Sequence, residues 1–365
     1  MKKLLYSLVV CFTVSMSATA QSSGGATDPH FSQFYAAPML LNPAMTGAFD
    51  CNYRFTAIFR GQWGSVLSSE AVPMFRTPSA SVDFRTNKGF MRGDAFGFGA
   101  YFLNDAAGQS QFQTNRFGLS IAYHKSLDRR NEHFISLGFT SAMWQRSINT
   151  ANLQFGDQND NGVFNPLKPS NEYIVNNNFL FWDVSVGLMY TGRFGRRARA
   201  SGYIGVAADH LNRPNESFLG DNSVRLPMKF TVHGGYRFPI KGRFDGQPKF
   251  IYMNQGVSHE LDMGMDLRIV FDEREREGSN FKVGAMYRLV GGDHAAAWHD
   301  ARLNSEAVIL NAGVEWNHIT FSAAYDINVS QLVKGSQSQG AFELAASYVG
   351  CFAKRRPATI FCPKF

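Results

Sequence analysis

The chain has 365 residues, a formal net charge of +7, a mean hydropathy of −0.21, and 33 Phe beside 34 Gly. No helical basic stripe, zinc-finger spacing or RNA-binding aromatic motif accompanies the positive charge, which argues against a nucleic-acid partner. The modest hydropathy and the many small and aromatic residues suit a membrane β-barrel, because only one face of each strand meets lipid. No linker or change of composition divides the chain, so we expect one domain after the leader.

The first twenty residues predict a secretory signal. Lys2 and Lys3 precede an apolar run, and Ala18-Thr19-Ala20 is a small-residue site for cleavage before Gln21. No later window reaches the roughly 18 uninterrupted apolar residues of a membrane helix. The expected organisation is a signal peptide over 1–20, a plug-like segment over 21–50, a barrel over 51–350 and a periplasmic tail over 351–365.

The stretch from Asp28 to Gly47 has the character of neither a leader nor a strand. Its three prolines disfavour a helix or a central strand. Its Phe, Tyr, Met and Leu residues are nevertheless too apolar for a solvated linker. We expect this stretch to pack inside the mouth of the barrel, and a surface arm laid across a sheet is the alternative.

From Cys51 onward, apolar and polar residues alternate with a period of two. Positions 53, 55, 57 and 59 are Tyr, Phe, Ala and Phe, whereas 54, 56 and 60 are Arg, Thr and Arg. This alternation predicts an all-β fold, a transmembrane antiparallel β-barrel of about 14 strands. The predicted strands are 51–61, 78–86, 94–103, 112–124, 132–144, 180–190, 200–210, 227–238, 247–253, 257–270, 279–289, 305–315, 317–326 and 341–350.

An even number of strands places both termini on one side of the membrane, which we expect to be the periplasmic side of the outer membrane. The longer connections, such as 62–77, 145–179 and 211–226, then face the cell exterior, and the shorter turns, such as 125–131 and 239–246, face the periplasm. The short turns are rich in Lys and Arg, which would meet anionic lipid headgroups or an acidic periplasmic partner.

Charged residues at inward-facing positions have both signs. Mixed charges in a narrow lumen pair with each other, which favours a filled or plugged barrel over an ion-selective channel. The inward charges are Arg54, Asp83, Arg85, Asp183, Lys229, Arg237, Glu260, Asp262, Asp266, Arg268, Lys282, Arg288 and Glu343.

Several stretches together resemble one protein family. They are DPHFSQFYAAPMLLNPAMTG at 28–47, FRGQW at 59–63, PSAS at 78–81, FLNDAAG at 102–108, HGGY at 233–236, YDINVS at 325–330, GAFEL at 340–344 and CPKF at 362–365. In these motifs the mature chain resembles the PorP/SprF family, outer-membrane proteins of the type IX secretion and gliding system of Bacteroidetes.

The resemblance implies a non-enzymatic barrel that binds, secretes or anchors a cell-surface partner protein. That partner would carry a type IX C-terminal sorting domain, and periplasmic components of the machinery would bind the barrel as well. An outer-membrane transporter or diffusion channel for small solutes is the alternative function. The family motif implies partner-binding or plug residues at Asp28, Pro29, His30, Phe31, Gln33, Phe34, Tyr35, Asn42, Pro43 and Gly47.

No set of residues predicts catalysis. Asp209 and His210 are an acid and a base side by side, but adjacent strand residues point to opposite faces and would not serve one site. Asp157, Asn159 and Asn161 begin like a calcium-binding loop, although its closing glutamate is replaced by Lys168. A solvated turn is the alternative there. We expect no cofactor, with Ca²⁺ as the one candidate ion.

Cys51, Cys351 and Cys362 remain in the mature chain, in an oxidising compartment. Cys51 starts the first strand and Cys351 follows the last, and these two strands are neighbours in a closed barrel. We expect a disulfide from Cys51 to Cys351 or to Cys362. A local bridge between Cys351 and Cys362 is the competing pairing.

Overall fold

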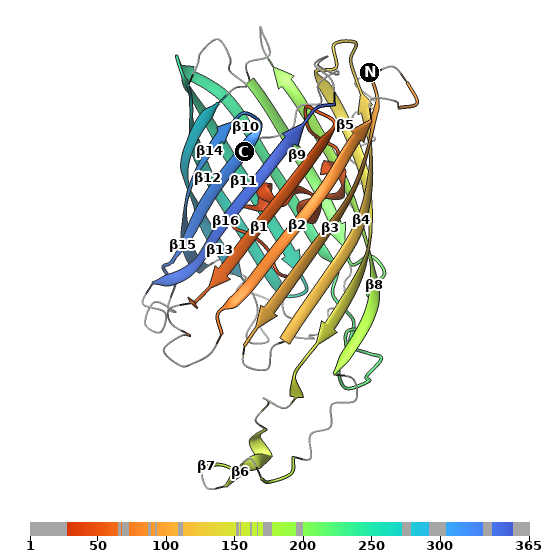
Figure 1. Ribbon diagram of the computed structural model, residues 1–365, viewed down its shortest axis with the longest axis vertical. Coiled ribbons are helices and arrows are strands. Elements are labelled where there is room, and N and C mark those ends of the chain that lie inside the picture. The colour runs from red at the N-terminus through yellow and green to blue at the C-terminus, as the bar shows by residue number, and fades with distance from the viewer. Residues whose placement is uncertain are drawn as a thin grey trace, which may run out of the picture.

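In the computed structural model, alternating apolar and polar residues form antiparallel strands that close into a barrel around a short helical segment (Figure 1). Fourteen barrel strands lie in the described part of the chain, in the order β1-β16-β15-β14-β13-β12-β11-β10-β9-β8-β5-β4-β3-β2. The predicted barrel is therefore confirmed. The structure describes residues 28–64, 67, 73–86, 89–91, 93–108, 112–150, 153, 155–160, 163–165, 167–170, 177–194, 200–271, 279–291, 304–330 and 338–352.

The barrel strands coincide with the predicted ones, and most extend a few residues further. They are β1 (Tyr53–Gln62), β2 (Phe75–Thr86), β3 (Ala95–Ala107), β4 (Phe112–Ser126), β5 (His133–Ser147), β8 (Asn178–Phe194), β9 (Ala200–Asp209), β10 (Lys229–Lys241), β11 (Phe244–Gln255), β12 (Ser258–Val270), β13 (Asn280–Gly291), β14 (Asn304–Trp316), β15 (Ile319–Asn328) and β16 (Gln339–Gly350). The short elements are η1 (Phe34–Ala36), α2 (Pro38–Leu41), η2 (Pro43–Met45), η4 (Gly156–Gln158), β6 (Asn159–Asp160) and β7 (Val163–Phe164).

The two faces of the barrel wall differ in chemistry. The outward residues Phe55, Phe102 and Leu119 leave 49%, 47% and 57% of their surface exposed. Residues that face the lumen, such as Arg54 and Asp83, are buried. An apolar outer face suits lipid, whereas the charged inner face needs partners within the lumen.

The two ends of the barrel also differ. At the end where β1 begins, turns at 127–132, 242–243 and 317–318 join the strands, and we call this the short-turn end. Connections at 63–74, 148–177 and 210–228 lie at the opposite, long-loop end, beyond which β6 and β7 project (Figure 1). The predicted separation of long and short connections holds in part. Residues 108–111 and 256–257 are short joins at the long-loop end, and residues 271–279 separate β12 from β13 at the short-turn end.

Aromatic rings gather on the outer surface near the short-turn end. The ring of Tyr53 lies 6.0 Å from that of Tyr348 and 5.1 Å from that of Phe352. Phe90 and Tyr123 make a similar contact at 5.4 Å. Because aromatic side chains favour the membrane–water interface, this girdle marks one boundary of the membrane.

Strands β1 and β16 close the barrel and are cross-linked at its short-turn end. Their register runs without interruption from Tyr53 opposite Gly350 to Gln62 opposite Ala341. Just beyond it, a disulfide joins Cys51 to Cys351, whose Cα atoms are 4.9 Å apart. This is one of the two long-range pairings left open by the sequence, and Cys362 lies outside the described residues.

Replacing Leu119 with Arg tests the lipid-facing assignment, because Leu119 lies at the middle of β4 with its side chain outward. We expect the barrel in lipid vesicles to lose about 2–4 kcal/mol of unfolding free energy, measured by denaturant titration. Leu167→Arg is the control, since Leu167 is 90% exposed in the 148–177 connection. Equal losses in the two variants would contradict the assignment.

Removing the disulfide tests the contribution of the cross-link. The bridge joins residues 300 positions apart, so the variant Cys51→Ser/Cys351→Ser should lose about 2–5 kcal/mol while still forming a barrel. Urea titration followed by the gel shift of the folded protein would measure the loss. Cys362→Ser should leave the midpoint unchanged, and a wild-type midpoint that is insensitive to reductant would argue against the bridge.

Candidate functional site

Residues 28–50 run through the lumen from one end of the barrel to the other (Figure 1). Asp28 hydrogen-bonds to His210 and Gln255, which lie where β9 and β11 end on the long-loop side. Phe49 lies near the short-turn end, where its carbonyl accepts a hydrogen bond of 2.8 Å from Arg85. We call residues 28–50 the lumen segment.

The described chain therefore begins and ends at opposite ends of the barrel. Asp28 is at the long-loop end, and Cys351 is at the short-turn end beside Cys51. Both termini lie outside the described residues, so their expected place in the periplasm stays a prediction. The lumen segment supplies one additional crossing of the barrel.

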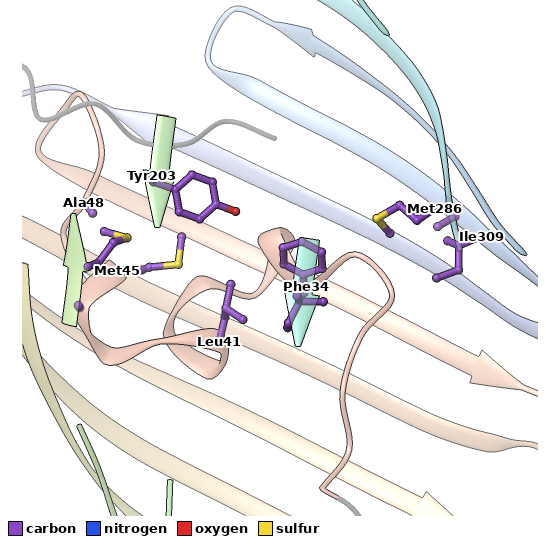
Figure 2. Packing of buried hydrophobic residues seen from close by; sticks show 11 residues of the cluster. Phe34, Leu41, Met45, Ala48, Tyr203, Met286 and Ile309 are labelled. Atoms are coloured by element: carbon purple, nitrogen blue, oxygen red, sulfur yellow. The ribbon is translucent and has the colours of Figure 1, made fainter. Parts of the chain in front are cut away.

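Apolar side chains of the lumen segment pack against inward-facing side chains of the wall. Phe34, Leu41, Met45 and Ala48 form one buried cluster with wall residues that include Tyr203, Met286 and Ile309 (Figure 2). Full burial of a Phe, Leu or Met side chain contributes about 1.5–3 kcal/mol. The segment is thus packed inside the barrel and is not laid across its outer surface.

Little space remains beside the lumen segment near the short-turn end. A cavity there, lined by Tyr35, Arg54, Lys282 and Glu315 among others, has a volume of about 80 Å³. Such a volume holds only a few water molecules. The cavity beside the segment is therefore small at this level of the lumen.

Glycines in the wall allow the lumen segment to approach closely. A Cβ atom at Gly187 of β8 would lie 1.9 Å from Oδ1 of Asn42, and one at Gly138 of β5 would lie 2.1 Å from the carbonyl carbon of Pro43. Both distances are far inside van der Waals contact, so these positions accept only glycine while the segment keeps its place. Asn42 and Pro43 therefore sit in a depression built for them.

Asn42 bonds to three different strands from this depression. Its Nδ2 donates to the carbonyls of Leu188 at 3.3 Å and Val206 at 3.2 Å, and lies 2.9 Å from Nε2 of His233. Its Oδ1 accepts from the N–H of Ala44 and starts η2. Asn42 therefore caps η2 and also anchors the lumen segment to β8, β9 and β10.

Gly187→Ala tests the close approach. The added methyl group must displace Asn42, and overpacking of this kind costs typically about 1–3 kcal/mol. We expect a lower thermal midpoint and faster protease cleavage within residues 28–50. Gly156→Ala is the matched control, because nothing lies within 4 Å of a Cβ at Gly156. A Gly187→Ala barrel as stable as wild type would contradict the packing described here.

A buried carboxylate binds the backbone of the lumen segment. The two oxygens of Glu343 accept hydrogen bonds from the N–H groups of Ser32 at 2.7 Å and Gln33 at 2.8 Å. Arg60 donates to the same carboxylate at 2.6 Å, so its charge is compensated. The hydroxyl of Ser32 donates in turn to Asp326 at 2.7 Å. Three wall strands, β1, β15 and β16, and the segment thereby share one hydrogen-bond network.

Arg288 extends this network toward His30. Its guanidinium donates to Ser32 Oγ at 2.8 Å and to Asp262 at 3.1 Å. Glu260 lies 3.1 Å from Arg288 and 3.0 Å from Nε2 of His30. Charges of both signs are paired throughout the network, as the sequence predicted for a filled lumen.

Glu343→Gln tests this network. The amide would present N–H donors to Arg60 or to the segment backbone in place of an acceptor, and the loss of one partner of a buried ion pair typically costs about 3–5 kcal/mol. We expect a corresponding fall in the urea midpoint. Glu132→Gln, in the turn between β4 and β5, should have no comparable effect. Equal midpoints for the two variants would contradict the network.

Asp28 and Asp183 flank the imidazole of His210 at the long-loop end. The Nε2 atom lies 2.8 Å from Asp28 and the Nδ1 atom 3.0 Å from Asp183. Burial opposes protonation, but the two carboxylates raise the pKa of His210 to about 9. Although burial also opposes ionisation of Asp28, the charge of His210 keeps the pKa of that carboxyl well below its usual range.

Asp209 and His210 both lie on the lumen side, contrary to the expectation from strand alternation. β9 ends at Asp209, and His210 follows with a positive φ of 60°, so the side-chain alternation stops there. Asp209 lies 3.9 Å from Lys229, while His210 contacts Asp28. The two neighbours take separate partners.

Toward the short-turn end, the backbone of the lumen segment bonds to inward side chains. His124 Nε2 lies 2.9 Å from the carbonyl of Thr46, and the N–H of Gly47 donates to Asp83 at 2.8 Å. Asp83 also accepts from Arg54 at 2.7 Å, and Arg54 donates to the carbonyl of Met45 at 3.1 Å. Backbone recognition therefore continues along the whole segment.

The structure places the predicted motif residues along the lumen and does not gather them at one point. The buried ones are Asp28, Phe31, Gln33, Phe34, Asn42, Pro43 and Gly47, and the half-buried ones are Pro29, His30 and Tyr35. Gln33 is bound through its backbone, and its side-chain amide has no hydrogen-bond partner among the described residues.

Sequence reasoning missed the importance of Ser32, Thr46 and the wall residues that bind them. Ser32 lies inside the family motif, but it is a common polar residue, and no spacing to other residues marks it as functional. Glu343 was recognised as an inward charge, but its partner lies 311 residues away and only the closed barrel brings them together.

The proposed calcium ligands lie in the 148–177 connection. Asp157 accepts hydrogen bonds from Ser170 Oγ at 2.9 and 3.2 Å, and Asn159 begins β6. Asn161 lies outside the described residues, so the calcium site stays a prediction. Among the described residues, no group of three or more His, Cys, Asp or Glu side chains is arranged to hold a metal ion. The same residues contain no helix that is long and apolar enough to cross a membrane.

A comparison with models of protein families shows the family of this chain. Residues 23–348 match the type IX secretion system membrane protein PorP/SprF. The chain belongs to the PorP/SprF family. The match includes the lumen segment and the barrel up to β16, so the features described above lie within the family domain. A comparison with curated protein sequences finds no match.

Solved structures with similar chain traces are outer-membrane barrels of low sequence identity. The toluene transporter TbuX of Ralstonia pickettii is 11% identical, with a TM-score of 0.47 over 89% of this chain and 96% of TbuX. The CymD monoaromatic hydrocarbon channel is 9% identical, with a TM-score of 0.46 over 87% and 93%. A FadL homologue of Pseudomonas aeruginosa is 10% identical, with a TM-score of 0.43 over 89% and 95%.

Proposed function

We propose that this chain is a non-enzymatic outer-membrane component of the type IX secretion and gliding machinery that binds a cell-surface partner protein and secretes or anchors it. The observation that carries the proposal is the lumen segment, which occupies the barrel along its length. A barrel filled by its own chain offers other proteins its two end surfaces. Membership in the PorP/SprF family supports the assignment to this machinery.

The two ends suit different partners. We assign the short-turn end to the periplasm and the long-loop end to the cell exterior, since barrels of this class have short periplasmic turns. The short-turn end exposes Arg129, Arg130, Lys241 and Arg243, which favour an acidic periplasmic component of the machinery. The long-loop end would receive the secreted partner with its C-terminal sorting domain.

Purification of the tagged full-length chain from native outer membrane tests the proposal. After cross-linking in intact cells, we expect a surface protein with a type IX sorting domain to copurify, and deletion of this chain should remove that protein from the cell surface. A strain that lacks the chain yet secretes and retains all such proteins normally would overturn the proposal.

Conductance measurements separate this function from the small-solute channel. In planar bilayers the intact barrel should be closed, because the lumen segment fills it. A steady conductance from the intact chain would favour the channel instead.

A further inference from the structure

Strand β8 has an edge without a neighbouring strand at the long-loop end. It pairs with β5 from Gly192 to Asn178, whereas β9 pairs with it only from Phe194 to Val186. Within the described part of the chain, residues 178–185 of β8 therefore extend past the last pair with β9. β5 and β8 reach beyond the neighbouring strands in this region (Figure 1).

The 210–228 loop hydrogen-bonds to the backbone of this edge at Val184 and Trp182. The N–H of Leu211 donates to the carbonyl of Val184 at 3.0 Å. The side-chain amide of Asn212 accepts from the N–H of Val184 at 3.2 Å and donates to the carbonyl of Trp182 at 2.6 Å. One side-chain amide thus takes the place of a peptide group in an adjacent strand.

The next backbone groups along the edge belong to Leu180. Alternate residues of a strand direct their N–H and C=O groups to the same side, so the groups of Leu180 point the same way as those of Trp182 and Val184. Among the described residues none bonds to Leu180 on that side. An unpaired edge of this kind is a template for another strand.

The edge is held rigid and lies outside the lipid-facing band. Inward side chains of β8 pack behind it: Phe179 lies 4.9 Å from Phe218, and Phe181 lies 5.6 Å from Trp144. On the outer surface, amide side chains form a hydrogen-bonded ladder across four strands at this level, through Asn104, Asn115, Gln145 and Asn178. Because polar amides do not suit hydrocarbon, the edge faces water.

We propose that the edge formed by Asn178 to Trp182 binds an extended segment of the partner protein by strand addition. A peptide backbone has alternating donors and acceptors at the spacing that this edge requires, which a lipid or a saccharide lacks. Leu180 and Trp182 are each 62% exposed beside it and select apolar side chains at alternate positions of the partner. The inference rests on the proposed function, and it specifies how the cell-surface partner is held.

Leu180→Pro tests the docking edge. Proline removes the N–H that points to the unpaired edge and leaves the hydrogen bonds of β8 to β5 in place, so the barrel should still fold. Leu180→Ala is the matched control, because it keeps the N–H. With the tagged full-length chain cross-linked in native cells, we expect Leu180→Pro to recover about tenfold less partner per folded barrel than Leu180→Ala, which loses the same side chain.

The outcomes separate the two proposals. Equal recovery of the partner with Leu180→Ala and Leu180→Pro overturns the docking edge and leaves the proposed function intact. If wild type itself recovers no surface protein, the proposed function fails and the docking edge fails with it.

If Leu180→Pro does not accumulate as a folded barrel, photo-cross-linking tests the docking edge instead. Benzoylphenylalanine at positions 178 and 180 should form adducts with one partner segment, at residues spaced two apart as in a strand pair. At position 137, a lipid-facing site of β5, it should form no such adduct. Adducts at 178 and 180 that fall on unrelated partner surfaces, or no adducts at all, would overturn the docking edge.

Discussion

The bond between the Glu343 carboxylate and the backbone N–H groups of Ser32 and Gln33 is the interaction on which the rest of the lumen depends. A carboxylate buried inside a barrel requires donors, because an unpaired charge there is costly. Arg60 alone would leave part of the carboxylate unsatisfied. The lumen segment supplies the missing donors. The wall in turn bonds to backbone groups that the short helical turns of the segment do not pair, such as the carbonyl of Thr46.

This mutual dependence explains why the inner face of the barrel is polar although the lumen is filled. Side chains that would line an aqueous pore in an open barrel are here bound to the segment or to each other, as Asp83 is to Gly47 and Arg54. Glycines at 138 and 187 remove the side chains that would keep the segment away. The disulfide at Cys51 then fixes the point where the segment leaves the lumen and enters β1.

In the proposed function, the filled lumen leaves the two end surfaces of the barrel for partner proteins. One end carries short basic turns beside an aromatic girdle, and the other carries long connections and the unpaired edge of β8. If the two ends bind different partners, as we propose, the chain connects the two sides of a membrane. The lumen segment, which crosses from one end to the other, makes this connection within a single chain.

The amino-acid sequence by itself determined the barrel, because alternation with a period of two is a local property of each strand and counting the alternating segments gives the number of strands. It also indicated many of the inward charges, although not Arg60, Arg116 or Asp326, and it showed that residues 28–47 need apolar burial. Only the tertiary structure decided that the segment crosses the whole lumen, since Ser32 and Glu343 become neighbours through barrel closure and not through any sequence spacing. For the same reason the position of His210 escaped prediction: its positive φ ends the alternation of β9, and the carboxylates that surround it come from Asp28 and Asp183.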